Sequence, residues 1–225
     1  MSQITICGLG SLLSEASARS TFPTLSGFRL GRISGFRRVF SHPADIFFQR
    51  GIADLPSLQM ASLSAEPCDG GSFFCAAFEV PAEGGIEAFR QRELEYDLQV
   101  VPFAEVDAAG AAVAPAGDPP MGLLCCRSTD AAFKARAPTE YAEYIRACGV
   151  DTVWGWAPDS GLRPCAVYLR HCVLAATKGG TLSLNSFLDE TFLIDRKTTL
   201  RAYLAEHPEV MSTEPPPELA QRYGG

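Results

Sequence analysis

The 225-residue sequence has no run of about 18 apolar residues, so no transmembrane helix is predicted. Its first residues lack a basic segment followed by an apolar core, so no signal peptide is expected and a cytoplasmic location is predicted. Basic residues are outnumbered: 19 Lys and Arg stand against 26 Asp and Glu, giving a net charge of −7. That balance argues against a general nucleic-acid-binding surface. We therefore expect neither a nucleic-acid partner nor a membrane partner.

Motifs for nucleotides and metals are missing as well. The Gly8-x-Gly10 pair lacks the third glycine of a dinucleotide fingerprint, and no Gly-Lys-Ser/Thr follows it as in a phosphate-binding loop. None of the eight cysteines forms Cys-x-x-Cys, and their spacing resembles no zinc site. Most lie in apolar stretches, which predicts reduced, mostly buried thiols. We expect no metal and no other cofactor, and structural roles for His42, His171 and His207.

The sequence does contain an apolar, partly β-branched stretch that ends in a glycine turn. Ile4 to Cys7 predict a first strand, and Gly8 and Gly10 predict a tight turn after it. Glycines let backbone N–H groups approach a ligand, because no Cβ stands in the way. Such a loop can donate several hydrogen bonds to a carboxylate or a developing oxyanion. An ordinary strand-to-loop turn is the alternative interpretation.

Hydrophobic periodicity predicts strands mainly in the first half of the chain and helices in the second. Strands are expected at 31–40 with a break at Gly35, at 60–65, at 72–80, at 94–100 and at 121–127. Helices are expected at 83–92, at 139–148 with Thr139 as the cap and Gly149 as the stop, from Pro164 to 178, and at 200–207. Residues 106–120 are predicted to be an exposed loop, and the segment from Pro215 a surface tail. Strands followed by helices predict an α+β fold in one compact domain.

The join between residues 83–92 and the next strand holds the one carboxylate considered for catalysis. If the helix runs through Glu93, that residue shares the apolar face of Ile86 and Phe89. Glu95 would then lie on the opposite side, or on the polar face of the strand, and is expected to be solvated. Burial raises the pKa of a carboxyl group toward the range of a general acid or base. A salt bridge between Glu93 and an arginine, or a surface position, is the alternative.

Four segments together resemble the γ-glutamylcyclotransferase-like family, close to its ChaC-type branch and plant relatives. They are Gly8-Leu9-Gly10-Ser11-Leu12-Leu13, Gly35-Phe36-Arg37-Arg38-Val39-Phe40, the strand pair from Ala61 to Phe78 around Gly70-Gly71, and Arg92-Glu93-Leu94-Glu95-Tyr96-Asp97. The last is similar to the family's Arg-Glu-x-x-Tyr motif. The resemblance covers about residues 4–105, and the acidic motif at the right distance from the glycine loop is its specific part.

The resemblance implies a small, partly closed β-barrel over residues 4–128, with flanking helices and a helical extension over 129–225 packed on it. It also implies a metal-free reaction on a small-molecule γ-glutamyl substrate. The substrate's α-amino group attacks its own γ-glutamyl carbonyl, which releases 5-oxoproline and a free amine, or cysteinylglycine if the substrate is glutathione. By the family pattern, Glu93 is the base that takes the proton from the α-ammonium. The residues implied in substrate binding are Leu9, Gly10, Ser11, Leu12, Leu13 and Tyr96.

Two other functions remain open at this point. Leu9 stands where the family loop has a tyrosine, which removes a ring and a hydroxyl near the site. That departure favours a catalytically inactive family member that keeps the barrel as a binding module, whereas the intact Arg92-Glu93 pair favours an enzyme. A thiol-dependent hydrolase that uses one of the cysteines is the third possibility, although the sequence shows no Cys–His pairing.

Overall fold

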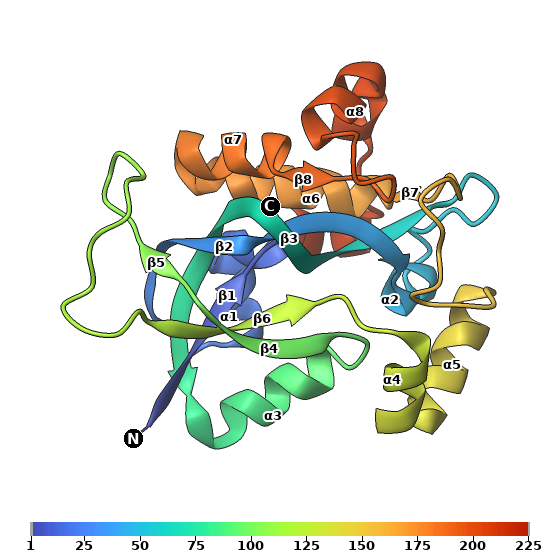
Figure 1. Cartoon of the computed structure of the whole chain (residues 1–225). Helices are drawn as coiled ribbons and strands as arrows, with labels where there is room; N and C mark the ends of the chain where they lie inside the picture. Colours follow the sequence, from blue (N-terminus) through green and yellow to red (C-terminus); the bar gives the residue numbers. More distant parts are fainter. Residues whose placement is uncertain (1, 225) are drawn as a thin grey trace.

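The computed structural model describes residues 2–224 and shows a mixed α+β fold around one strongly curled sheet (Figure 1). The sheet has eight strands, and six of them follow the order β4-β6-β1-β3-β2-β5. The strands are β1 (Gln3–Gly8), β2 (Ser26–Pro43), β3 (Gln59–Pro81), β4 (Asp97–Pro102), β5 (Ala104–Glu105), β6 (Met121–Cys126), β7 (Arg163–Pro164) and β8 (Thr191–Phe192). The predicted α+β class is confirmed.

Helices flank the sheet. They are α1 (Glu15–Thr21), α2 (Asp45–Gln49), α3 (Ala82–Arg92), α4 (Asp130–Arg136), α5 (Pro138–Cys148), α6 (Ala166–Lys178), α7 (Gly180–Asp189), α8 (Leu200–Glu206) and α9 (Ala220–Tyr223), with short 3₁₀ turns η1 (Ser11–Leu13), η2 (Pro208–Ser212) and η3 (Pro217–Leu219). Figure 1 shows α3 on one side of the sheet and α6 and α7 on the other. None of the helices in residues 2–224 combines the length and apolar character of a membrane-spanning segment.

Two long antiparallel strands form the spine of the sheet. β2 pairs with β3 from Ser26 opposite Glu79 to Pro43 opposite Ala61. The break expected at Gly35 is a β-bulge instead: the register shifts there, and Gly35 and Gly70 have positive φ angles of 81° and 72°. Glycine takes up this irregularity without ending the ladder. The two strands expected at 60–65 and 72–80 are therefore one continuous strand.

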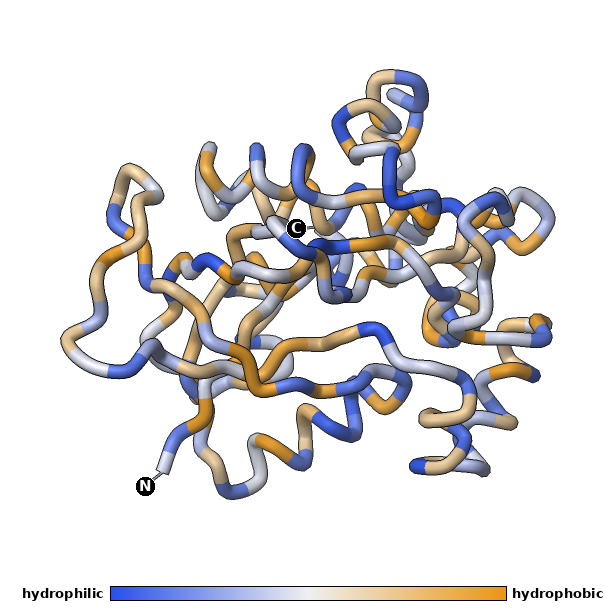
Figure 2. Tube along the Cα trace, viewed as in Figure 1, coloured by the Kyte–Doolittle hydropathy of each residue, from blue (hydrophilic) through white to orange (hydrophobic). Residues whose placement is uncertain are grey.

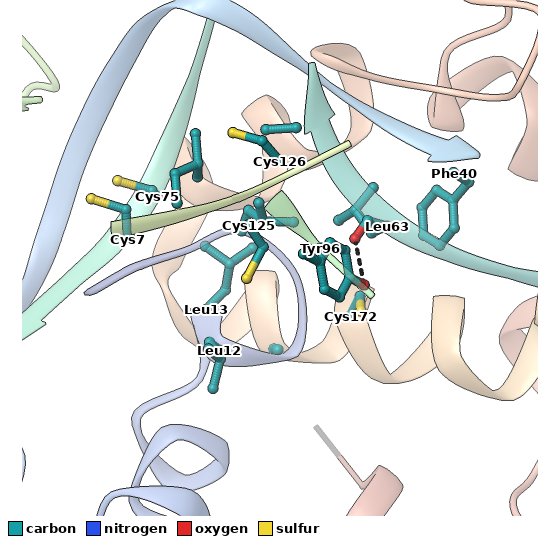
Figure 3. Packing of buried hydrophobic residues seen from close by; sticks show 14 of the residues in the cluster. Cys7, Leu12, Leu13, Phe40, Leu63, Cys75, Tyr96, Cys125, Cys126 and Cys172 are labelled. Carbon is teal, nitrogen blue, oxygen red and sulfur yellow. Dashed lines mark hydrogen bonds between the residues drawn. The ribbon is translucent and has the colours of Figure 1, made fainter. Parts of the chain in front are cut away.

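The curvature of β3 partly closes the sheet into a barrel. One end of β3 pairs with β1, where Phe78 lies opposite Ile6, while Ala65 nearer its other end pairs with Cys126 of β6. β6 also pairs with β1, so the three strands enclose a common apolar interior. Figure 2 shows hydrophobic residues along these central strands, and Figure 3 shows Cys7, Cys75, Cys125 and Cys126 among the buried side chains. Seven of the eight cysteines are buried and all eight are free, as predicted.

The second half departs from the predictions mainly at helix starts. Pro164 pairs with β3 as part of β7, and α6 begins only at Ala166. Helix α5 begins at Pro138, so Ala137 and not Thr139 occupies its cap position. Gly149 ends α5 in the left-handed conformation, as predicted. Residues 106–120 form the expected exposed loop.

The C-terminal segment is not the surface tail that its prolines predicted. After η3, the chain turns back through α9, and the side chain of Tyr223 is buried in a small apolar cluster. That cluster contains Phe47 and Ile52 from the α2 region and Cys165 from the start of α6. Burial of an aromatic ring is a sufficient reason for a short, proline-rich segment to dock. The docking brings α9 beside α1, where Arg222 donates to Ser20 Oγ at 2.8 Å.

Candidate active site

The turn after α3 carries the candidate acidic residues. Helix α3 ends at Arg92 and β4 begins only at Asp97, so neither geometry considered for this join is found. Residues 93–96 form a turn in which Tyr96 N–H donates to the Glu93 carbonyl at 3.1 Å. The turn places Leu94 outward, at 36% exposure, while Glu93, Glu95 and Tyr96 line one cavity.

This cavity has a volume of about 550 Å³. Its walls come from the glycine turn, the turn after α3, the α2 region, α6 and the C-terminal segment. The sequence-predicted residues that line it are Leu9, Gly10, Ser11, Leu12, Glu93 and Tyr96. Leu13 is not among them: its side chain is buried in the core (Figure 3), and its N–H donates to the Gly10 carbonyl at 2.9 Å. The prediction of a substrate contact for Leu13 is therefore not supported.

The glycine turn presents free backbone donors, as its composition predicted. Within residues 2–224, the N–H groups of Gly10, Ser11 and Leu12 have no hydrogen-bond acceptor. A Cβ on Gly10 would lie 2.9 Å from the hydroxyl of Tyr168 and 3.3 Å from Leu63. Only glycine therefore lets the chain pass this close to α6. Three neighbouring donors at the start of a helical turn are suited to an anion or an oxyanion.

Glu93 is ion-paired inside the cavity. Its Oε1 lies 2.7 Å from Nε of Arg92, and its side chain is 13% exposed. Arg92 also donates from Nη1 to Thr21 Oγ1 on α1. Burial alone would lower the pKa of Arg92, but Glu93, together with Tyr168 and Cys125, offsets this and the pKa is raised. Glu93 therefore forms the salt bridge with an arginine that the sequence left open as the alternative, and this salt bridge lies at the cavity wall.

The expected solvated position of Glu95 is wrong. Its side chain is partly buried, and Oε1 lies 3.4 Å from the hydroxyl of Tyr144. Its carbonyl accepts a hydrogen bond from the Trp154 indole at 3.1 Å, which holds the turn in place. Burial, and then the nearby Glu93 carboxylate, raise the pKa of Glu95 to about 8. Glu95 is therefore mainly protonated at pH 7.

Tyr96 forms a fixed part of the cavity wall. Its hydroxyl donates to the Leu63 carbonyl at 3.0 Å (Figure 3) and lies 3.2 Å from Ser62 Oγ. The imidazole of His42 packs edge-on against the Tyr96 ring at 5.0 Å and stacks on Trp154 at 4.1 Å. Because the hydroxyl is already hydrogen-bonded, Tyr96 is suited to shaping the cavity rather than to exchanging a proton.

The cysteines at the cavity are poor nucleophiles. Cys7 and Cys125 are among its lining residues. Burial, together with the carboxylate of Glu93, raises the pKa of the Cys125 thiol well above its ordinary value. Hydrogen bonding to Cys75 and burial do the same for Cys7. Because the thiolate is the reactive form, this environment disfavours the thiol-hydrolase alternative.

Sequence reasoning missed the basic side of the cavity. Arg50 follows α2 and donates from Nη1 to the Tyr223 hydroxyl at 2.7 Å. Arg222 of α9 donates to Ser20 Oγ at 2.8 Å. His171 also lines the cavity, and burial followed by the charge of Arg222 lowers its pKa to about 4. No local pattern marks these residues, because only docking of the C-terminal segment brings them together.

No protein-family model and no curated protein matches the sequence. Solved structures with similar folds include an uncharacterized human protein, at 12% identity over 67% of this chain and 89% of that chain, with a TM-score of 0.41. A γ-glutamyl cyclotransferase has the same identity and coverage and a TM-score of 0.40. A yeast γ-glutamyl cyclotransferase specific to glutathione matches at 15% identity over 94% of this chain and 96% of that chain, with a TM-score of 0.43. Similarities this distant assign no activity to the chain, so its function has to be argued from the residues of the cavity.

Proposed function

We propose that this protein is a γ-glutamyl cyclotransferase that releases 5-oxoproline from γ-glutamyl peptides or amines. One arrangement carries the proposal: Glu93 and Glu95 line the same cavity, the first paired with Arg92 and the second in surroundings whose desolvation raises its pKa to about 8. Cyclisation needs one group that accepts a proton and another that donates one. Two carboxyl groups in different surroundings, one in a salt bridge and one with a raised pKa, meet that need.

The reaction starts with removal of a proton from the substrate's α-ammonium. In the proposed mechanism, the Glu93 carboxylate accepts this proton, and the free amine attacks the γ-carbonyl carbon of the same molecule. The bond from that carbon to the leaving nitrogen then breaks as Glu95 donates its proton to the nitrogen. The ring nitrogen, which is positively charged after the attack, passes its second proton to the leaving amine. The products are therefore 5-oxoproline and an ammonium ion, and transfer of one proton from Glu93 to Glu95 restores the starting state.

The free N–H groups of Gly10, Ser11 and Leu12 support the same chemistry. They are suited to the α-carboxylate of the γ-glutamyl group or to the oxyanion that forms at the attacked carbonyl. Because nucleophile and electrophile belong to one substrate, orientation accounts for much of the rate. Holding a reactive conformer can lower a barrier by up to about 7–11 kcal/mol.

The direct test is to incubate the purified protein with γ-glutamyl peptides and γ-glutamyl amines and to measure 5-oxoproline by chromatography. Glu93→Gln is expected to lower kcat by at least about 100-fold, because positioned acid–base groups contribute about 10²–10⁴. Glu95→Gln should also lower kcat, since Glu95 is the proposed acid. Glu87→Gln is the matched control, because Glu87 is exposed on α3 and outside the cavity. No 5-oxoproline from any substrate, or normal turnover by Glu93→Gln, would contradict the proposal.

A binding module is the second candidate. The Glu93 carboxylate is already held in a salt bridge with Arg92, and Leu9 supplies no hydroxyl to the cavity. A binding module would retain a γ-glutamyl compound in calorimetry without releasing 5-oxoproline. Substitution of Glu93 would then change affinity alone.

A further inference from the structure

Three arginines from distant parts of the sequence line one cavity. Arg50 follows α2, Arg92 ends α3, and Arg222 lies in α9. Arg92 and Arg222 donate to Thr21 and Ser20, which are consecutive residues of α1. Arg50 in turn donates to the hydroxyl of Tyr223, the residue after Arg222, and its guanidinium lies 5.5 Å from the centre of that ring. These contacts attach the three side chains to α1 and α9 at the cavity wall.

Within residues 2–224, two of the three guanidinium groups are not in a salt bridge. Arg92 is paired with Glu93, but across the described part of the chain neither Arg50 nor Arg222 has a carboxylate within salt-bridge distance. This is unusual in a chain whose net charge is −7. The pKa of Arg222 is lowered by burial and then by the charges of Arg92 and Arg50. Repulsion between like charges is relieved when an anion binds among them.

We infer that Arg50 and Arg222, beside Arg92, bind a carboxylate in the amine half of the substrate. The preferred substrates are then γ-glutamyl amino acids and short γ-glutamyl peptides, rather than γ-glutamyl amines that lack a second carboxylate. This inference rests on the proposed function. Arginine suits the role because its planar fork of N–H donors matches a carboxylate. The free N–H groups of the glycine turn remain for the γ-glutamyl half.

Two ligands that cannot cyclise test the inference by binding alone. Glutarylglycine and the monomethylamide of glutaric acid both lack the α-amine, and they differ by a single carboxylate. Isothermal titration calorimetry on the whole protein is expected to show at least about tenfold tighter binding of glutarylglycine, as for a charge-assisted hydrogen bond. Arg222→Gln and Arg50→Gln should each lower that preference to about threefold or less and leave the affinity for the methylamide unchanged. Arg90→Gln is the control, because Arg90 is exposed on α3 outside the cavity.

Each outcome decides the question. Equal affinity of the wild-type protein for the two ligands, or binding of neither, overturns the inference. An equal loss of affinity for the two ligands in Arg222→Gln and Arg50→Gln also overturns it, since both residues then act only on the shape of the cavity.

Turnover of γ-glutamylglycine and γ-glutamylmethylamide separates the inference from the proposed function. Selective binding of glutarylglycine without release of 5-oxoproline supports the carboxylate site and refutes the cyclotransferase. Equal turnover of the two compounds, with no selectivity in binding, refutes the carboxylate site alone.

Discussion

Glu95 provides a test of the site's electrostatics that needs no substrate. Its pKa is raised from 4.5 to about 8 in the folded protein, a difference of about 3.5. Each pKa unit corresponds to about 1.4 kcal/mol, so the full difference corresponds to about 5 kcal/mol. That value is an upper bound, because Glu93 shares the interaction. Replacing Glu95 by glutamine removes the titrating group and keeps a side chain of similar size.

The sign follows from where the proton is bound. Between pH 4.5 and about 8 the folded protein keeps the proton on Glu95, while the unfolded chain releases it. The stability contributed by the raised pKa is therefore complete below pH 4.5 and is lost as pH rises to about 8. Wild type is expected to lose up to about 1.4 kcal/mol of unfolding free energy per pH unit from this group. Glu95→Gln lacks this loss, so its stability relative to wild type grows with pH.

Urea denaturation at pH 5, 6, 7 and 8, followed by the fluorescence of the two tryptophans, Trp154 and Trp156, measures the effect. The difference in unfolding free energy between Glu95→Gln and wild type should increase steadily over the series, by several kcal/mol in total. A constant difference caused by the amide itself does not affect this slope. Glu87→Gln, on the exposed face of α3, should show the same pH dependence of the unfolding free energy as wild type. If the free energy of unfolding of Glu95→Gln also changes with pH as that of wild type does, Glu95 has an ordinary pKa and cannot be the proposed acid.

Four further predictions concern turnover. The rate should fall above about pH 8 as Glu95 loses its proton, and this limb should disappear in Glu95→Gln. Gly10→Ala should lower kcat/KM by about tenfold or more in steady-state assays, because its Cβ would lie 2.9 Å from the Tyr168 hydroxyl. Alkylation of Cys68, the one partly exposed cysteine, should leave turnover intact, whereas inactivation by one label would revive the thiol hydrolase. Chelators should not change the rate, and loss restored by a divalent ion would refute the metal-free mechanism.

Local patterns were sufficient where the physical cause is local. The strand Ile4–Cys7, the glycine turn and the left-handed Gly149 all follow from conformational preferences of neighbouring residues. Gly70-Gly71 lies just before the second of the two strands expected at 60–65 and 72–80. The sequence around these glycines does not show that the strand is continuous, because its continuity depends on pairing with a distant strand. Only the pairing of β3 with β2, which brings these glycines opposite the bulge at Gly35, shows that the strand continues.

Part of the candidate site could also be predicted from the sequence. The glycine turn, Glu93 and Tyr96 do line one cavity. Glu95 was misplaced because both periodicities tried at this join assume regular structure, whereas residues 93–96 form a turn. Arg222 was missed because a proline-rich end gave no sign that Tyr223 would be buried. Such convergence depends on tertiary packing, which no local window of sequence contains.

Pairing between distant parts of the chain also determines when the cavity can form during folding. β2 pairs with β8 through Arg38 and Thr191, and β3 pairs with β7 through Ala61 and Pro164. Contacts across such separations form slowly, because long loops must close first. An intermediate in which α9 has not yet docked lacks Arg222 at the cavity and cannot hold a carboxylate there. A bound anion is therefore expected to act late: it slows unfolding of the finished protein and leaves the folding rate almost unchanged.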